Sequence, residues 1–148
     1  MVKQISIFQR VAWAYAAGFL FVVAIGHIQG LTDPQGKLFG FYNVSTLIDA
    51  VHFIAGLLGA LAAWHSTKWA INYLKLIGIP FGLDTLISLF FSRDLLETFS
   101  IFTKGIGMSD FSIHNFLANS PHIFLSAVAL WTGFYLSRKL NTYSKVSN

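Results

Sequence analysis

The sequence predicts an all-α integral membrane protein, a bundle of four transmembrane helices. Of its 148 residues, 55% are hydrophobic and 11% are charged, and the mean hydropathy is +0.62. So few charged side chains could not cover the water-facing surface of a soluble domain of this size. Four long apolar segments, separated by polar residues and turn formers, are the second observation. We therefore expect a single four-span domain over residues 1–148.

Each apolar segment is long enough to cross a bilayer as a helix, which takes roughly 20 residues for a hydrocarbon core about 30 Å thick. The predicted spans cover about 11–28, 44–64, 69–91 and 115–136. The first span follows Lys3 and Arg10, and a cleaved signal peptide is the alternative interpretation of this segment. Its apolar run is longer than the roughly 7–15 residues of a signal-peptide core, which favours a retained helix.

The connections between the predicted spans differ in length. Residues 29–43 and 92–114 form long outer loops, whereas 65–68 is a tight turn. The first loop is rich in glycine and is predicted to consist of turns. In the second loop, the apolar segment 95–102 predicts a short helix in the membrane interface.

Basic residues predict the orientation, because cytoplasmic loops and tails carry more lysine and arginine. The four-span layout places seven of them on the side of both termini and three on the other side. The two groups are Lys3, Arg10, Lys68, Lys75, Arg138, Lys139 and Lys145, against Lys37, Arg93 and Lys104. Both termini are therefore expected in the cytoplasm, with the chain in a bacterial inner membrane or a related membrane.

The basic residues do not indicate nucleic acid as a partner, although the net charge is +4. They come in ones and twos along the chain and do not gather on one face. The expected partners are the lipid bilayer and either further copies of the chain or other membrane subunits.

A weak internal repeat relates the second and fourth spans, with His52 and His122 at equivalent positions. Small residues follow each histidine at offsets of four, seven and eleven; they are Gly56, Gly59 and Ala63, and Ser126, Ala129 and Gly133. These offsets place each set on one helical face, where another helix can pack closely. The pattern predicts two repeated helix hairpins, related by an axis along the membrane normal.

The residues that carry this pattern are Asn43, Asp49, His52, Gly56 and Gly59 in the second span, and Asn119 and His122 in the fourth. With four short spans around it, the pattern resembles a family of small four-helix bacterial integral membrane proteins that is catalogued only as a domain of unknown function. The resemblance covers about residues 18–133 and implies the four-span layout, without an activity. Pro121 and Ser126 depart from the family pattern.

Four ionisable residues are predicted to share one layer beneath the outer membrane surface. Counted from the cytoplasmic ends of their helices, His27, His52, Asp84 and His122 rise roughly 20–26 Å into the bilayer. An aspartate near the centre of a span costs about 2.5–3.5 kcal/mol. We therefore expect a compensating partner for Asp84, and we expect Asp84 and His52 to face a common cavity.

Several partners would lower the cost of burying Asp84. A bound proton, a hydrogen-bonded histidine, a cation or a second subunit would each do so. The simplest alternative is a neutral carboxyl that is hydrogen-bonded to Thr85, Ser88 or a neighbouring helix and serves only packing.

The sequence leaves three functional hypotheses open. It lacks a phosphate-binding loop, a nucleophile elbow and a paired acidic motif, so a structural or accessory subunit of a larger membrane assembly, without catalysis of its own, is the first. The second is a haem- or chlorophyll-binding subunit for electron transfer or light harvesting, with His52 and His122 as ligands. The third is a proton or ion pathway centred on Asp84.

The histidines also allow two simpler interpretations. His27, His52, His122 and Asp49 have the right donor atoms for a transition-metal site, although no paired ligand motif specifies a metal. Alternatively, these histidines only fix the outer loops through hydrogen bonds. The sequence identifies no cofactor.

Overall fold

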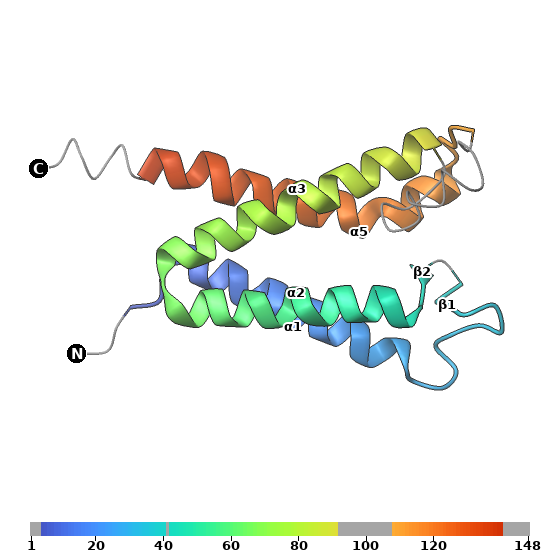
Figure 1. Ribbon diagram of the computed structural model, residues 1–148. Coiled ribbons are helices and arrows are strands. Elements are labelled where there is room, and N and C mark those ends of the chain that lie inside the picture. Colours follow the sequence, from blue (N-terminus) through green and yellow to red (C-terminus); the bar gives the residue numbers. More distant parts are fainter. Residues whose placement is uncertain (1–3, 41, 92–107, 141–148) are drawn as a thin grey trace, which may run out of the picture. The chain divides into compact units, whose positions relative to one another are not determined.

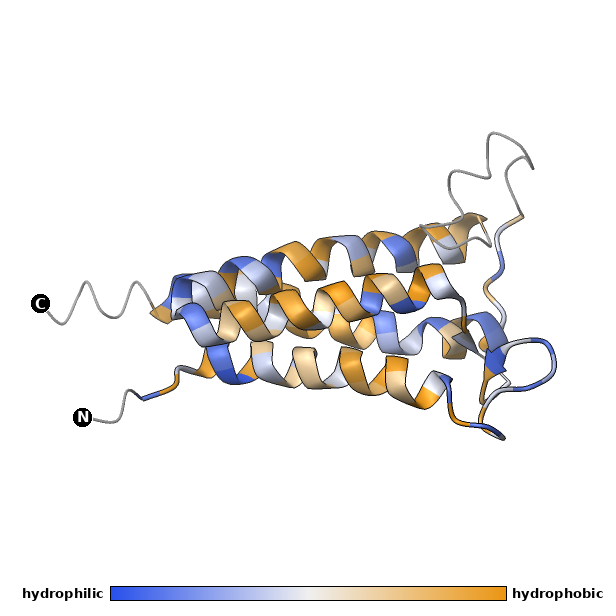
Figure 2. Ribbon diagram, turned by 60° about the horizontal axis from the view of Figure 1, so that its bottom comes forward, coloured by the Kyte–Doolittle hydropathy of each residue, from blue (hydrophilic) through white to orange (hydrophobic). Residues whose placement is uncertain are grey.

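The computed structural model describes residues 4–40, 42–91 and 108–140 and is mostly helical (Figure 1). It divides into two compact units, residues 1–73 and 74–148. Three of the described helices are long and apolar enough to cross a membrane: α1 (Ile7–Gly26), α2 (Thr46–His65) and α3 (Thr67–Phe91). Apolar residues dominate the middle of the helices (Figure 2). The predicted interfacial helix at 95–102 lies outside the described residues.

In the first unit, α1 and α2 form an antiparallel hairpin whose open end, where α1 begins and α2 ends, is fixed by polar contacts. Ser6 and Gln9 form a capping box at the start of α1, in which each side chain accepts a hydrogen bond from the other's backbone N–H. The Gln9 amide then donates to the Ala63 carbonyl near the end of α2, at 2.8 Å. Thr67, the first residue of α3, donates to the Ser6 hydroxyl at 3.0 Å.

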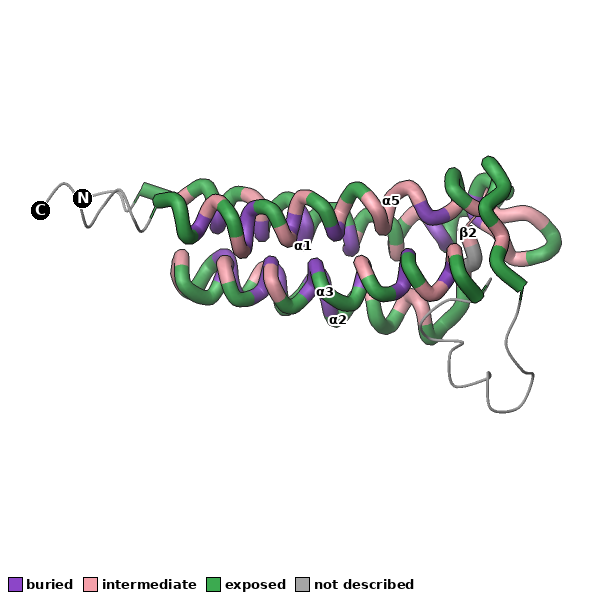
Figure 3. Tube along the Cα trace, turned by 90° about the horizontal axis from the view of Figure 1, so that it is seen from above, coloured by how far each residue is buried: buried purple, intermediate pink, exposed green. Residues whose placement is uncertain are grey.

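Glycines allow close contacts on α2 in this unit. A Cβ atom at Gly56 would lie 2.9 Å from the Leu20 side chain, and one at Gly59 would lie 2.7 Å from the ring of Tyr73. The Tyr73 hydroxyl donates to the Ala55 carbonyl at 3.0 Å, which holds the ring against the small-residue face of α2. Buried and exposed residues accordingly alternate along the helices (Figure 3).

The first outer loop contains more regular structure than the turns that the sequence predicts. A short antiparallel ladder pairs β1 (Lys37–Leu38) with β2 (Tyr42–Asn43). Between them, Phe39 and Gly40 adopt positive φ angles of 55° and 76°. Only glycine adopts such angles at no steric cost, so the tight turn depends on Gly40.

In the second unit, the part of α3 from Leu74 onward packs against α5 (Ile113–Leu130). Helix α5 begins at the cap residue Ser112, which accepts from the Asn115 backbone N–H. It continues into the π-helix η2 (Trp131–Leu136), and helical structure extends to residue 140. The predicted fourth span is therefore helical, but its regular α-helix has only 18 residues.

Small residues again mark the contact between the two helices of the second unit. A Cβ atom at Gly78 would lie 2.9 Å from the Leu130 side chain, and one at Gly82 would lie 3.7 Å from Ser126. The six small residues of the predicted repeat, Gly56, Gly59, Ala63, Ser126, Ala129 and Gly133, are all buried.

Candidate functional site

Asp84 on α3 and His122 on α5 form a carboxylate–imidazole pair in the second unit. Asp84 Oδ2 lies 2.6 Å from His122 Nδ1, and the two side chains are 12% and 31% exposed. The ring of Phe81, three residues before Asp84, meets the imidazole edge to face at a centroid distance of 4.8 Å. The pair is thus held on one side by an aromatic ring, which restricts the imidazole to the orientation that reaches the carboxylate.

A row of polar side chains continues from this pair toward the start of α5. Asn119 donates to the Ser88 hydroxyl at 2.8 Å, and Ser88 lies one helical turn beyond Asp84. Asn119 also donates to the carbonyl of Asn115 at 2.9 Å. We call Asp84, Ser88, Asn115, Asn119 and His122 the polar row.

The polar row ends outside the helices. The Asn115 amide donates to the Asp110 carbonyl at 2.7 Å, and Asp110 precedes α5. The Asp110 carboxylate accepts from the Ser112 backbone N–H at 2.9 Å. This hydrogen bond, reinforced by one from the Ser112 side chain and by the nearby His114, lowers the pKa of Asp110. Hydrogen bonds thus connect Ser88 and Asn119, each about one turn from the Asp84–His122 pair, with the backbone of Asp110 before the start of α5.

The chemistry of the pair follows from its short distance. One proton placed on either partner gives a neutral carboxyl beside a neutral imidazole, or a carboxylate beside an imidazolium. Both forms carry no net charge, so neither leaves an isolated charge in apolar surroundings.

The first unit contains a second acid–histidine pair, in a different environment. His27 Nε2, at the end of α1, lies 3.1 Å from Asp49 Oδ2 in the first turn of α2. The His27 side chain is 68% exposed and that of Asp49 is 15% exposed. This pair ties the two ends of the outer loop together, and the carboxylate also lies favourably at a helix N-terminus.

His52 lies on α2 with its ring against Phe19 of α1, at a centroid distance of 5.6 Å. It belongs to the first unit, whereas Asp84 and His122 belong to the second. The common cavity of His52 and Asp84, and the joint ligation of a cofactor by His52 and His122, therefore stay predictions. Among the described residues, no three histidine, aspartate or glutamate side chains gather as a metal site requires.

The two hairpins share a set of contacts that sequence reasoning found only in part. A phenylalanine of the first helix meets the histidine of the second in Phe19–His52 and in Phe81–His122. The next residue of the first helix meets the small residue one turn after the histidine, in Leu20–Gly56 and Gly82–Ser126. Between the two hairpins, the equivalent residues of the first helices are 62 positions apart in sequence, and those of the second helices are 70 positions apart.

Sequence reasoning missed Phe19 and Phe81, because the residues that follow them, Leu20 and Gly82, are unlike and conceal the repeat. The same spacing of 62 places Val22 at the position equivalent to Asp84. The carboxylate is therefore particular to the second hairpin.

Comparisons with protein-family models, with curated protein sequences and with solved structures find no match for this chain.

Proposed function

We propose that this chain is a multi-pass membrane protein that binds and passes protons at the Asp84–His122 pair, as an accessory subunit of a larger membrane assembly. The observation that carries the proposal is the 2.6 Å contact between Asp84 and His122 within an apolar hairpin. Ionisable residues inside a span are costly and commonly mark proton or ion pathways. The membrane location is supported by three helices of sufficient length and hydropathy.

The polar row supports a pathway over a purely structural role. A hydrogen bond that serves packing alone needs one donor and one acceptor, and the pair would suffice. Here Ser88, Asn119 and Asn115 extend the hydrogen bonding up to Asp110 at the end of the hairpin. The amide side chains do not carry protons themselves, so the part of the polar row in this proposal is to line a route by which water reaches the buried carboxylate.

The repeated contacts support an origin by duplication of a helix hairpin. In this view both hairpins keep the phenylalanine–histidine contact and the small-residue contact. Asp84 then distinguishes a proton-binding second hairpin from a first hairpin that has Val22 at the equivalent position. The first hairpin supplies the fold and fixes the outer loop through His27 and Asp49.

Proton flux into vesicles tests this function. The protein is reconstituted into vesicles that contain a trapped pH-sensitive dye, and a potassium gradient with an ionophore drives protons inward. We expect wild-type vesicles to acidify faster than empty ones, and D84N to fall to the empty-vesicle rate, because an amide keeps the hydrogen bond but cannot carry the proton.

The matched control is D49N, which changes the acid of the other pair. It should keep the wild-type rate, because the His27–Asp49 contact lies at the edge of the outer loop. The proposal fails if the wild-type protein acidifies vesicles no faster than empty membranes, or if D84N and D49N reduce the rate equally.

A further inference from the structure

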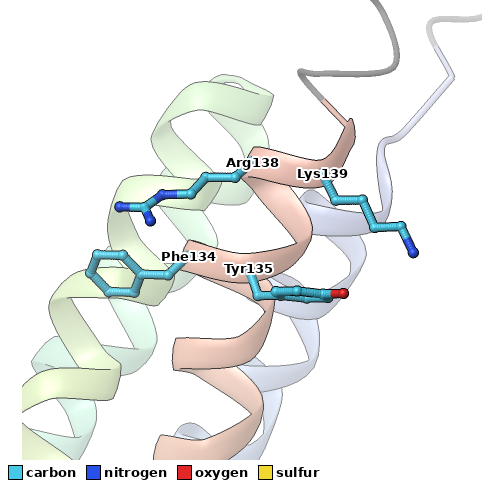
Figure 4. A pocket seen from close by; sticks show the side chains of 4 residues that line it. All are labelled: Phe134, Tyr135, Arg138 and Lys139. Atoms are coloured by element: carbon cyan, nitrogen blue, oxygen red, sulfur yellow. The ribbon is translucent and has the colours of Figure 1, made fainter.

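A pocket with basic and aromatic walls lies at the C-terminal end of the second unit. Its lining consists of Phe134, Tyr135, Arg138 and Lys139, and its volume is about 410 Å³. Figure 4 shows Arg138 extending on the same side as the ring of Phe134, and Lys139 on the same side as Tyr135. The rings and the cations thus form two pairs that extend to opposite sides of the helix, and within each pair the cation follows the ring by one helical turn.

A third cation belongs to the same site. Lys75 of α3 places its ammonium group 5.0 Å from the centroid of the Phe134 ring, within the range of a cation–π contact. The described acidic side chains of this unit, Asp84 and Asp110, lie farther toward its other end. Asp84 is nine residues from Lys75, which is about 13 Å along a helix. Among the described residues, this end of the unit is therefore strongly positive.

Aromatic and aliphatic surface lies next to these charges. Trp131 stacks on Tyr135 with a centroid distance of 6.0 Å. Both rings are exposed, at 56% and 55%, and Leu76 on α3 is 60% exposed. Indole and phenol rings favour the headgroup layer, while leucine favours the acyl chains. A ligand that fits this site carries an anionic group and an apolar tail.

We propose that this pocket binds the phosphate of an anionic phospholipid in the cytoplasmic leaflet. Arg138 offers the paired N–H groups that match phosphate oxygens, and Lys75, against the Phe134 ring on the same side, contributes a point charge. Lys139 adds positive charge on the other side of the helix. Basic pockets at the cytoplasmic ends of transmembrane helices bind anionic headgroups in this way. The acyl chains then lie along the exposed apolar surface of the hairpin. The inference depends on the membrane location proposed above, but not on proton transfer.

Competition between two lipids tests the site. The protein in mild detergent is offered equal amounts of phosphatidylglycerol and phosphatidylcholine, and bound lipid is counted by native mass spectrometry. We expect the wild type to retain phosphatidylglycerol preferentially. In R138Q/K139Q the preference should fall about fivefold for each charge removed.

Two control variants separate a headgroup site from general attraction. K68Q removes a lysine that is predicted on the same membrane side but does not line the pocket, and it should keep the full preference. R138K/K139R keeps both charges and should keep most of it. The proposal is overturned if K68Q and R138Q/K139Q lose the preference equally, or if excess inorganic phosphate displaces the lipid, which would indicate a site for a free anion.

Flotation of the protein with vesicles made of both lipids distinguishes the two proposals. A chain that does not float with vesicles contradicts the membrane location. A chain that floats normally and shows no preference for phosphatidylglycerol contradicts only the lipid site.

Discussion

Asp84 on α3 pairs with His122 on α5 across the interface of the second hairpin. Its cost in an apolar span predicts a compensating partner, and a histidine is among the candidates. Which histidine takes that role depends on the register of α3 against α5, and Asp84 and His122 are 38 positions apart in sequence. That register depends on packing at Gly78 and Gly82, which hydrophobic periodicity does not determine. The pairing itself therefore could not be predicted.

The pH dependence of the start of α5 is a prediction for Asp110. Because the Ser112 hydrogen bonds lower its pKa, the ionised form stabilises the native state. The stabilisation is fully present above the ordinary carboxyl pKa and is lost as the pH falls through the lowered value. The protection factors of the amide hydrogens of residues 112–115, which correct for the intrinsic pH dependence of exchange, should therefore fall on acidification in the wild type.

The variant D110N provides the comparison for this measurement. An asparagine does not ionise in this range, so the extra pH dependence should disappear and residues 112–115 should be equally protected at all pH values tested. Identical pH profiles for the two proteins would show that Asp110 does not stabilise this helix end.

At the scale of the elements, periodicity and composition predict the helices but not their local departures. The apolar segments correspond to α1, α2 and α3, because a long apolar run in a chain this poor in charge has few alternatives to a helix. The ladder of β1 with β2 and the π-helix η2 have no such signal. Both depend on local hydrogen bonding, such as that of Ser137 to the Gly133 carbonyl at 2.6 Å.

Enlarging Gly59 is predicted to destabilise the first hairpin. In G59A the new methyl group would lie 2.7 Å from the Tyr73 ring, whose hydroxyl is held by the Ala55 carbonyl. The ring cannot move without losing that bond, so we expect a cost of about 1–3 kcal/mol. Thermal unfolding in detergent, followed by helix content, measures it.

Gly18 on α1 supplies the matched control, because a Cβ atom there would meet no atom within 4 Å. G18A should leave the stability unchanged or raise it by up to about 1 kcal/mol, since alanine favours a helix. If G59A and G18A both unfold at the same temperature as the wild type, the close approach at Gly59 does not contribute to stability.

At the scale of the whole molecule, the proposed function assigns different tasks to two similar hairpins. Both have a phenylalanine–histidine contact, and in the second hairpin the carboxylate of Asp84 lies 2.6 Å from the histidine of that contact. The histidine-centred repeat was visible in the sequence because offsets of four, seven and eleven recur in it. The matching contacts on the first helix of each hairpin were not visible in the sequence, because the equivalent positions hold different residues. Ala16 corresponds to Gly78, and Leu20 corresponds to Gly82.

The most direct test of the central claim is the nitrogen-15 NMR spectrum of the histidine side chains in bilayers, for the wild type and for D84N. If Asp84 and His122 share a proton, the Nδ1 resonance of His122 should show a strong hydrogen bond in the wild type. It should shift in D84N, while the resonances of His27 stay unchanged. Identical His122 resonances in the two proteins would contradict the shared proton and, with it, a pathway centred on this pair.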